Sequence, residues 1–201
     1  MQITDDLRLV LPLRRDAKGE PVVLGYHTPI SRETYEASYR ILAATKAALF
    51  AKGTAFAADV GPQIAALRLR DEARQDARDQ GDIDNEGKGR DTVAVALLAD
   101  LRRLTMVMCA TPTGWEPIPV DIAISRGVMD LDDWRDAEGG LVFFTCSYAM
   151  ATKTTRRGIS EAVAGVMGAS ITSLPLTEFV ASLTTQTMDA PMTPAASSVP
   201  V

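Results

Sequence analysis

The sequence predicts a mainly α fold: a helical domain with an N-terminal β-hairpin and a flexible C-terminal tail. Three observations predict it. Apolar residues recur at helical spacing along most of the chain, residues 7–14 alternate with the two-residue period of a strand, and the chain from residue 184 onward is rich in Thr, Ser, Pro and Ala. Because 201 residues fit one domain with an appendage, we expect a single domain over residues 1–183 and a disordered tail over residues 184–201.

Residues 1–26 are expected to form the hairpin. Its first strand places leucine at every second position on one face, at Leu7, Leu9, Leu11 and Leu13. Turn residues at 16–19 precede a second apolar run at 22–26, which can return antiparallel. Pro12 has no N–H to donate, so it predicts that its strand lies at a sheet edge. A lone hairpin is marginally stable in water, and its leucine face must therefore pack on the helices or on another subunit.

Three helices are expected next, over residues 28–53, 62–80 and 91–109. The second begins at Pro62, because proline is favoured at the first helical position. The third begins after Asp91 and has the clearest helical period in the chain, so we expect it to be central; its apolar positions are Val93, Ala96, Leu97, Leu101, Leu104, Val107 and Met108.

Residues 111–119 hold three prolines and cannot form a regular helix. Each proline removes a backbone donor and restricts the residue before it. We expect a short helix over residues 120–126, ended by Gly127 because glycine is common just after a helix.

Residues 131–168 are expected to be helical. Asp130 and Asp133 form a variant of the capping box, in which Glu or Gln is usual at the later position. The pair Gly139–Gly140 weakens this helix and predicts a kink or a break. Residues 141–151 are so apolar that a strand could use them as well, but their length and flanks favour a buried helix.

Composition limits the function classes. The chain has one histidine, His27, whereas general acid–base catalysis, nucleophile triads and most transition-metal sites recruit histidine. We therefore expect a binding or assembly protein that is not an enzyme and uses no cofactor. A net charge of -5 and a pI near 5.0 argue against nucleic acid as the main ligand, because its binding depends on neutralising phosphates. No signal sequence or membrane-spanning run is found, so no membrane partner is expected and a cytoplasmic location follows.

Two acidic clusters match metal sites only in part. Residues 82–87 place acids and glycine as an EF-hand loop does at its start, but the twelfth position is Val93 instead of the required Glu. The second cluster lies at the start of a helix, where the macrodipole favours acids without any metal: Asp130, Asp132, Asp133 and Asp136. We expect no metal site. Cys109 and Cys146 lie in apolar runs, which indicates buried thiols.

Six residues are candidate contacts with a protein partner: Tyr35, Tyr39, Trp115, Trp134, Leu174 and Phe179. Aromatic side chains are enriched at interface hot spots but also serve as core anchors. The sequence leaves both roles open for the two tryptophans. The two tyrosines lie on the apolar stripe of residues 28–53, and the last two candidates belong to an amphipathic segment at residues 171–180.

Several stretches carry a resemblance to a known family: residues 26–31 leading into 39–46, residues 115–121, residues 132–134 with 141–144, and residues 172–179. In order, they resemble the tail assembly chaperones of long-tailed, siphovirus-like bacteriophages over most of the chain. The Thr-Ser-Leu and Thr-Glu-Phe triplets within residues 172–179 look like the endings of such phage proteins. None of these stretches is a catalytic signature.

The resemblance implies a non-enzymatic helper in the host cytoplasm. It would coat the tape measure protein, recruit tail tube protein subunits and leave the finished particle, with no nucleic-acid or membrane partner. Such a protein needs apolar surface and a flexible end rather than a base, a nucleophile or a metal. The edge of the hairpin and its leucine face make a homo-oligomer an open expectation.

Two other functions compete with this interpretation. A structural virion protein, such as a head–tail connector or a tail terminator, would be found in purified particles, whereas a chaperone would not. A small enzyme that uses carboxylates would need a pocket joining its acids, for which the candidates are Asp130, Asp133 and Glu138.

Overall fold

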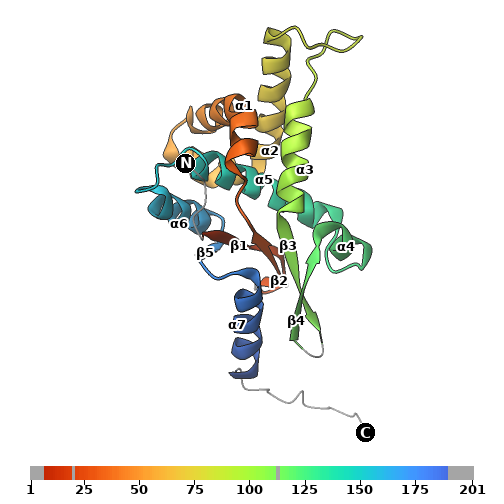
Figure 1. Cartoon of the computed structure of the whole chain (residues 1–201), viewed down its shortest axis with the longest axis vertical. Helices are drawn as coiled ribbons and strands as arrows, with labels where there is room; N and C mark the ends of the chain where they lie inside the picture. The colour runs from red at the N-terminus through yellow and green to blue at the C-terminus, as the bar shows by residue number, and fades with distance from the viewer. Residues whose placement is uncertain (1–6, 20, 112–113, 190–201) are drawn as a thin grey trace.

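The computed structural model describes residues 7–19, 21–111 and 114–189. Within this part of the chain it has seven helices, with 57% helical content, and a five-stranded antiparallel sheet that accounts for 19% (Figure 1). The predicted N-terminal hairpin is present, but the prediction of a mainly α fold is wrong. The protein is a mixed α/β fold, because three further strands join the hairpin.

The sheet has the strand order β4-β3-β2-β1-β5, and every neighbouring pair is antiparallel. Its register places Val10, Tyr26, Met106 and Pro119 in one row across four strands. The strands are β1 (Arg8–Arg15), β2 (Pro21–His27), β3 (Thr105–Thr111), β4 (Gly114–Pro119) and β5 (Ser170–Thr172).

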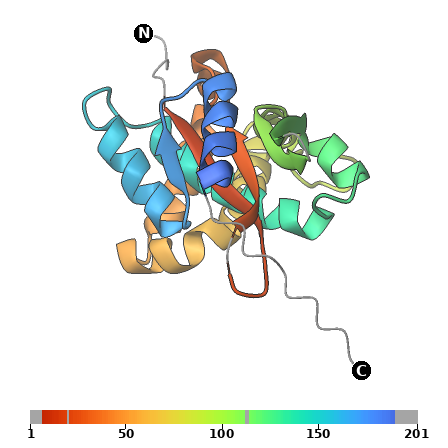
Figure 2. The ribbon, with the colours of Figure 1, turned by 90° about the horizontal axis from the view of Figure 1, so that it is seen from below.

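Most of the helices cover one face of this sheet, and the last helix lies on the other face (Figures 1 and 2). The helices are α1 (Arg32–Phe50), α2 (Thr54–Asp79), α3 (Thr92–Arg103), α4 (Val120–Ser125), α5 (Leu131–Tyr148), α6 (Arg156–Val166) and α7 (Leu176–Asp189). We call the face toward α1, α2, α3 and α5 the inner face and the face toward α7 the outer face.

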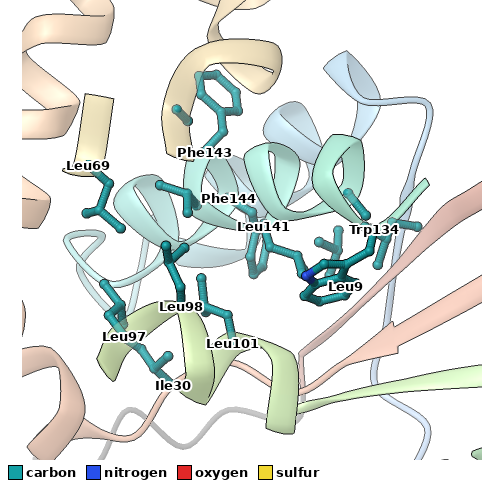
Figure 3. Close-up of a cluster of buried hydrophobic side chains, with 14 of the residues drawn as sticks. Leu9, Ile30, Leu69, Leu97, Leu98, Leu101, Trp134, Leu141, Phe143 and Phe144 are labelled. Atoms are coloured by element: carbon teal, nitrogen blue, oxygen red, sulfur yellow. The ribbon is translucent and has the colours of Figure 1, made fainter. Parts of the chain in front are cut away.

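Helix α5 is the centre of the main core. Every residue from 139 to 148 is buried, which is typical of a helix that is surrounded on all sides. Leu141 and Phe144 lie among side chains of α3 and of strand β1 (Figure 3). The choice of helix over strand for residues 141–151 is confirmed as far as Tyr148. The expectation that the third helix would be central is wrong, since α5 holds that place.

The glycine pair in α5 does not break the helix. Gly139 and Gly140 lie within a continuous α5, so the predicted break is absent from this helix. Gly139 lies where α5 crosses α2, and Gly61 of α2 approaches α5 at the same crossing, whereas a Cβ on Gly140 would meet Met167, just after α6. A Cβ on Gly61 would lie 2.7 Å from the Phe143 ring. Gly139 and Gly61 therefore serve close packing between α2 and α5.

Several helix boundaries differ from the predicted ones. The second helix begins at Thr54 rather than at residue 62, and Pro62 lies inside it. The third helix ends at Arg103, so the predicted span 91–109 is wrong in its last part, which forms β3. Both faces of β3 are covered, with Val107 buried inside and Met108 buried outside. A strand covered on both faces is apolar throughout and does not show alternation.

The end of the chain is more regular than predicted. The backbone of α7 continues to Asp189, so the expected disordered tail over 184–201 is wrong for its first residues; residues 190–201 lie outside the described part. The segment 131–168 holds two helices, α5 and α6, with non-helical residues between them.

The hairpin prediction is largely confirmed. Leu9, Leu11 and Leu13 are buried in the main core against the helices. Strand β1 is not the sheet edge along its whole length, because β5 pairs with its first residues, Arg8 to Val10. Pro12 lies beyond the end of β5, where β1 does become an edge and a missing N–H is tolerated.

Candidate functional site

The outer face of the sheet carries a second, smaller apolar cluster. Helix α7 covers this cluster, and Figure 2 shows α7 in front of the strands. We call it the outer-face cluster, and it consists of Val10, Leu24, Tyr26, Met106, Met108 and Trp115 from the sheet, with Leu176, Phe179, Val180 and Leu183 from α7.

The sequence of α7 explains why the helix lies on the sheet. Its four cluster residues follow the spacing i, i+3, i+4 and i+7, which places them on one helical face. The residues between them, such as Thr177, Glu178 and Ala181, are exposed. The helix therefore has one apolar side, and that side faces the strands.

Tyr26 and Phe179 form an aromatic contact within the cluster. Their ring centroids are 5.3 Å apart with planes tilted by 37°, a favourable arrangement for two aromatic rings. The Tyr26 hydroxyl donates a hydrogen bond of 2.8 Å to the Leu174 carbonyl in the linker before α7. Burial raises the pKa of the Tyr26 phenol and outweighs the opposite effect of the nearby Arg8. Tyr26 thus contacts both the helix and its linker.

The structure brings three of the six sequence candidates together. Trp115 and Phe179 belong to the outer-face cluster, and Leu174 lies next to it through the hydrogen bond from Tyr26. Tyr35 and Tyr39 are on α1, among the inner-face helices; Tyr35 packs partly against the main core and Tyr39 is 54% exposed.

Trp134 is a core residue. It is 2% exposed, and the Arg102 guanidinium lies over its ring at 5.5 Å from the centroid. It presents almost no surface to a partner. The sequence left open whether this tryptophan is a core anchor or an interface residue, and in the structure it is a core anchor. Figure 3 shows its ring beside Leu9 of β1.

Sequence reasoning missed the strand residues of the outer-face cluster as candidates. Tyr26, Met106 and Met108 meet only through the sheet register, which joins distant parts of the chain. Val10 could have indicated this cluster from the sequence. It is apolar, although it lies on the strand face opposite the leucines, which is usually polar. Two apolar faces on one strand indicate cover on both sides.

His27 is buried and unsuited to surface chemistry. Its Nδ1 lies 2.9 Å from the Thr105 hydroxyl oxygen, and that hydroxyl donates to the Leu101 carbonyl at 2.8 Å. Because the hydroxyl hydrogen is already used, Nδ1 must carry the proton and donate. Desolvation lowers the pKa of His27 to about 3, with the positive charge of Arg8 as a smaller cause. The His27 ring is therefore neutral and makes one hydrogen bond, at the end of β2 where the chain leaves the hairpin.

The acids of the carboxylate hypothesis are engaged in local structure. Asp130 accepts from the Asp133 backbone N–H at 2.8 Å, and the Asp133 carboxylate accepts from the Asp130 N–H at 2.9 Å, so the predicted capping box is confirmed. Glu138 lies 3.8 Å from Arg70 in an ion pair. A cavity of about 400 Å³ is lined by Asp130 and Asp133 together with Arg14, and Glu138 is not among its lining residues.

The segment 82–87 forms a turn. The Asp84 carboxylate accepts backbone hydrogen bonds from Lys88 and Glu86, both at 2.9 Å, and these bonds lower its pKa. Over the described ranges, no group of three or more His, Cys, Asp or Glu side chains is arranged to hold a metal ion.

Among the described helices, none combines the length and the apolar composition needed to cross a bilayer. Comparison with family models, with curated proteins and with solved structures finds no match to this chain.

Proposed function

We propose that this chain is a non-enzymatic tail assembly chaperone of a long-tailed bacteriophage, acting in the host cytoplasm. In this proposal it binds an apolar helical segment of the tape measure protein on its outer sheet face and recruits tail tube protein subunits. The order of sequence segments that resemble this family supports the proposal. The observation that carries it is the outer-face cluster.

The outer-face cluster suits a helical client. Its sheet side is a platform of apolar and aromatic side chains from four strands, and a helix already packs on it. Helix-in-groove recognition uses an apolar surface of this kind, with anchors at the spacing seen in α7. Met106 and Met108 add flexible, polarizable side chains, which adapt to clients of different shape.

The edges of the sheet favour the chaperone role over that of a structural virion protein whose copies form a ring by pairing their sheets edge to edge. Edge strand β4 carries Pro117 and Pro119, which cannot donate to an added strand, and the opposite edge strand β5 has only three residues. A structural virion protein that extends its sheet from copy to copy would need a longer and more regular edge. These edges are poorly suited to pairing with another sheet, so we place partner recognition on the outer face.

Co-expression with a tape measure protein tests the proposal. The wild-type chain should keep the tape measure protein soluble and co-purify with it. Met106→Asp places a charge in the outer-face cluster and should abolish co-purification, whereas Tyr39→Ala changes an exposed aromatic residue on α1 and should leave it intact. Circular dichroism of both variants confirms that each is folded.

Analysis of purified particles separates the two phage roles. A chaperone is absent from finished virions, and a connector or terminator is present in fixed copy number. Detection of this chain in purified virions, or loss of tape measure binding in Tyr39→Ala but not in Met106→Asp, would contradict the proposal.

A further inference from the structure

We infer that α7 is a detachable cover, which occupies in the free chain the same sheet face that an amphipathic client helix takes when it binds. Binding then requires α7 to leave the outer face by rotation about its linker, residues 173–175. The identity of the client rests on the proposed function, but the detachment of α7 does not.

Few described side chains of α7 are buried on the sheet. Of these side chains only Phe179 is buried, at 8% exposed, while Leu176, Val180 and Leu183 are partly buried. Among the described residues, the outer-face cluster has four buried members, against thirty in the main core. Segments with few buried apolar contacts open locally at lower free energy than the core does. Helix α7 can therefore open while the rest of the fold stays intact.

Among the described side chains, no charge pair holds α7 on the sheet, and Glu178 of α7 is exposed. The hydrogen bond from the Tyr26 hydroxyl to the Leu174 carbonyl joins the linker to the outer-face cluster, whereas the Leu174 N–H donates to the Thr172 hydroxyl of β5, on the side of the hinge that stays in place. The bond from Tyr26 contributes only about 1 kcal/mol net, so it holds the linker without locking it.

The linker between β5 and α7 is short and exposed. Three exposed residues, Ser173, Leu174 and Pro175, separate strand β5 from α7. Because Pro175 has a fixed φ and restricts Leu174, the change in backbone angles that a hinge needs falls mainly on Ser173 and on ψ of Pro175. Strand β5 remains paired with β1 on the far side of the hinge.

The chemistry of the face identifies the occupant. Helix α7 shows that a helix with apolar residues at i, i+3, i+4 and i+7 fits the strands. The charged side chain that acts on Tyr26 of the cluster is Arg8, a cation. A competing helix should therefore combine this apolar spacing with acidic rather than basic residues beside it, because an acid complements Arg8.

A peptide added in trans provides the direct test. The probe is a synthetic fluorescein-labelled peptide of residues 173–189 of this chain, and its binding to the full-length protein is measured by fluorescence anisotropy. Phe179→Asp in the full-length chain should loosen its own α7 and leave the sheet side of the cluster intact. We expect this variant to bind the peptide about tenfold or more tightly than the wild type, because the wild-type face is covered.

Matched variants control for other effects. Glu178→Gln alters the exposed side of α7 and should leave peptide affinity at the wild-type value. Tyr26→Phe removes the hydrogen bond to Leu174 from the chain's own linker and from the added peptide alike, so the apparent peptide affinity should stay within about threefold of the wild-type value. The double variant Phe179→Asp with Met106→Asp should bind no peptide, because the face itself is then damaged.

Hydrogen exchange of the wild-type chain gives an independent readout. Amides of α7 should exchange much faster than those of α5, through an opening that Phe179→Asp accelerates. Equal peptide affinity in wild type and Phe179→Asp, or equal protection of α7 and α5, would overturn the inference. A dimer of the wild type with exchanged α7 helices, seen by light scattering, would also overturn it, since the occupant would then be a second copy. None of these readouts uses a phage protein, so failure of the chaperone proposal would show separately, in the tape measure experiment.

Discussion

Gly139 of α5 lies so close to Pro62 of α2 that a Cβ on Gly139 would be 2.3 Å from the Pro62 carbonyl oxygen. This contact is with backbone, which cannot move aside as the end of a side chain can. Helices α2 and α5 can approach this closely only because residue 139 has no side chain. The crossing fixes the position of α5, around which the main core is built.

Gly139→Ala should therefore lower the free energy of unfolding by about 3 kcal/mol or more, measured by urea denaturation, because overpacking forces the two helices apart. Gly165→Ala is the control: it lies in α6 with nothing within 4 Å of a new Cβ. That substitution should raise the free energy of unfolding by up to about 1 kcal/mol through helix propensity. Equal effects of the two substitutions would contradict this account of the crossing.

Acid should destabilise the fold through His27. The pKa of this residue is about 3 in the folded chain and about 6.5 when unfolded, so between these values the unfolded chain binds a proton that the folded chain does not. The free energy of unfolding should thus fall as the pH falls from 6.5 to 3, by at most about 5 kcal/mol from this group.

His27→Asn is the matched variant, because its side-chain amide can still donate to Thr105 and does not titrate. As His27 is the only histidine, the variant should lose this part of the pH dependence between pH 6.5 and 4. Identical pH profiles of unfolding for the variant and the wild type would disprove the assignment.

The two cysteines should differ in reactivity. Cys146 is buried, and desolvation raises the pKa of its thiol to about 12, so almost no thiolate forms at pH 8. Cys109 is half-buried and within reach of a reagent. The native chain should react with one equivalent of a disulfide reagent and with a second one only in denaturant; native Cys109→Ser should not react. Rapid modification of native Cys109→Ser would contradict the burial of Cys146.

Asp130 should act as a helix cap rather than as a catalytic acid. Asp130→Ala removes two hydrogen bonds to the first turn of α5 and should lower the free energy of unfolding by about 1 kcal/mol. Asp91 is the matched control, since it precedes α3 without a side-chain capping bond. Asp91→Ala should cost less than about 0.5 kcal/mol, the value of an exposed ion pair. Client binding should survive both substitutions, and its loss in Asp130→Ala alone would point to a functional carboxylate.

The sequence by itself determined the elements whose signals are local. The leucine alternation predicted β1, and the Asp130–Asp133 pair predicted the start of α5, because strand period and capping depend on neighbouring residues only. The same local spacing pointed to Phe179 as an apolar anchor. The prolines of residues 111–119 excluded a helix there, and Pro117 and Pro119 lie in edge strand β4.

Only the tertiary structure decided that residues 105–111 are a strand, that α5 is central, and that Trp115 joins the same cluster as Phe179 while Trp134 stays in the core. Strand β3 forms because β2 and β4 supply its hydrogen-bond partners, and neither partner is visible in its own run of apolar residues. Burial on both faces removes the alternation that marks a strand in sequence. The outer-face cluster is assembled by pairing between residues far apart in the chain, so its existence depends on the fold and not on any one segment.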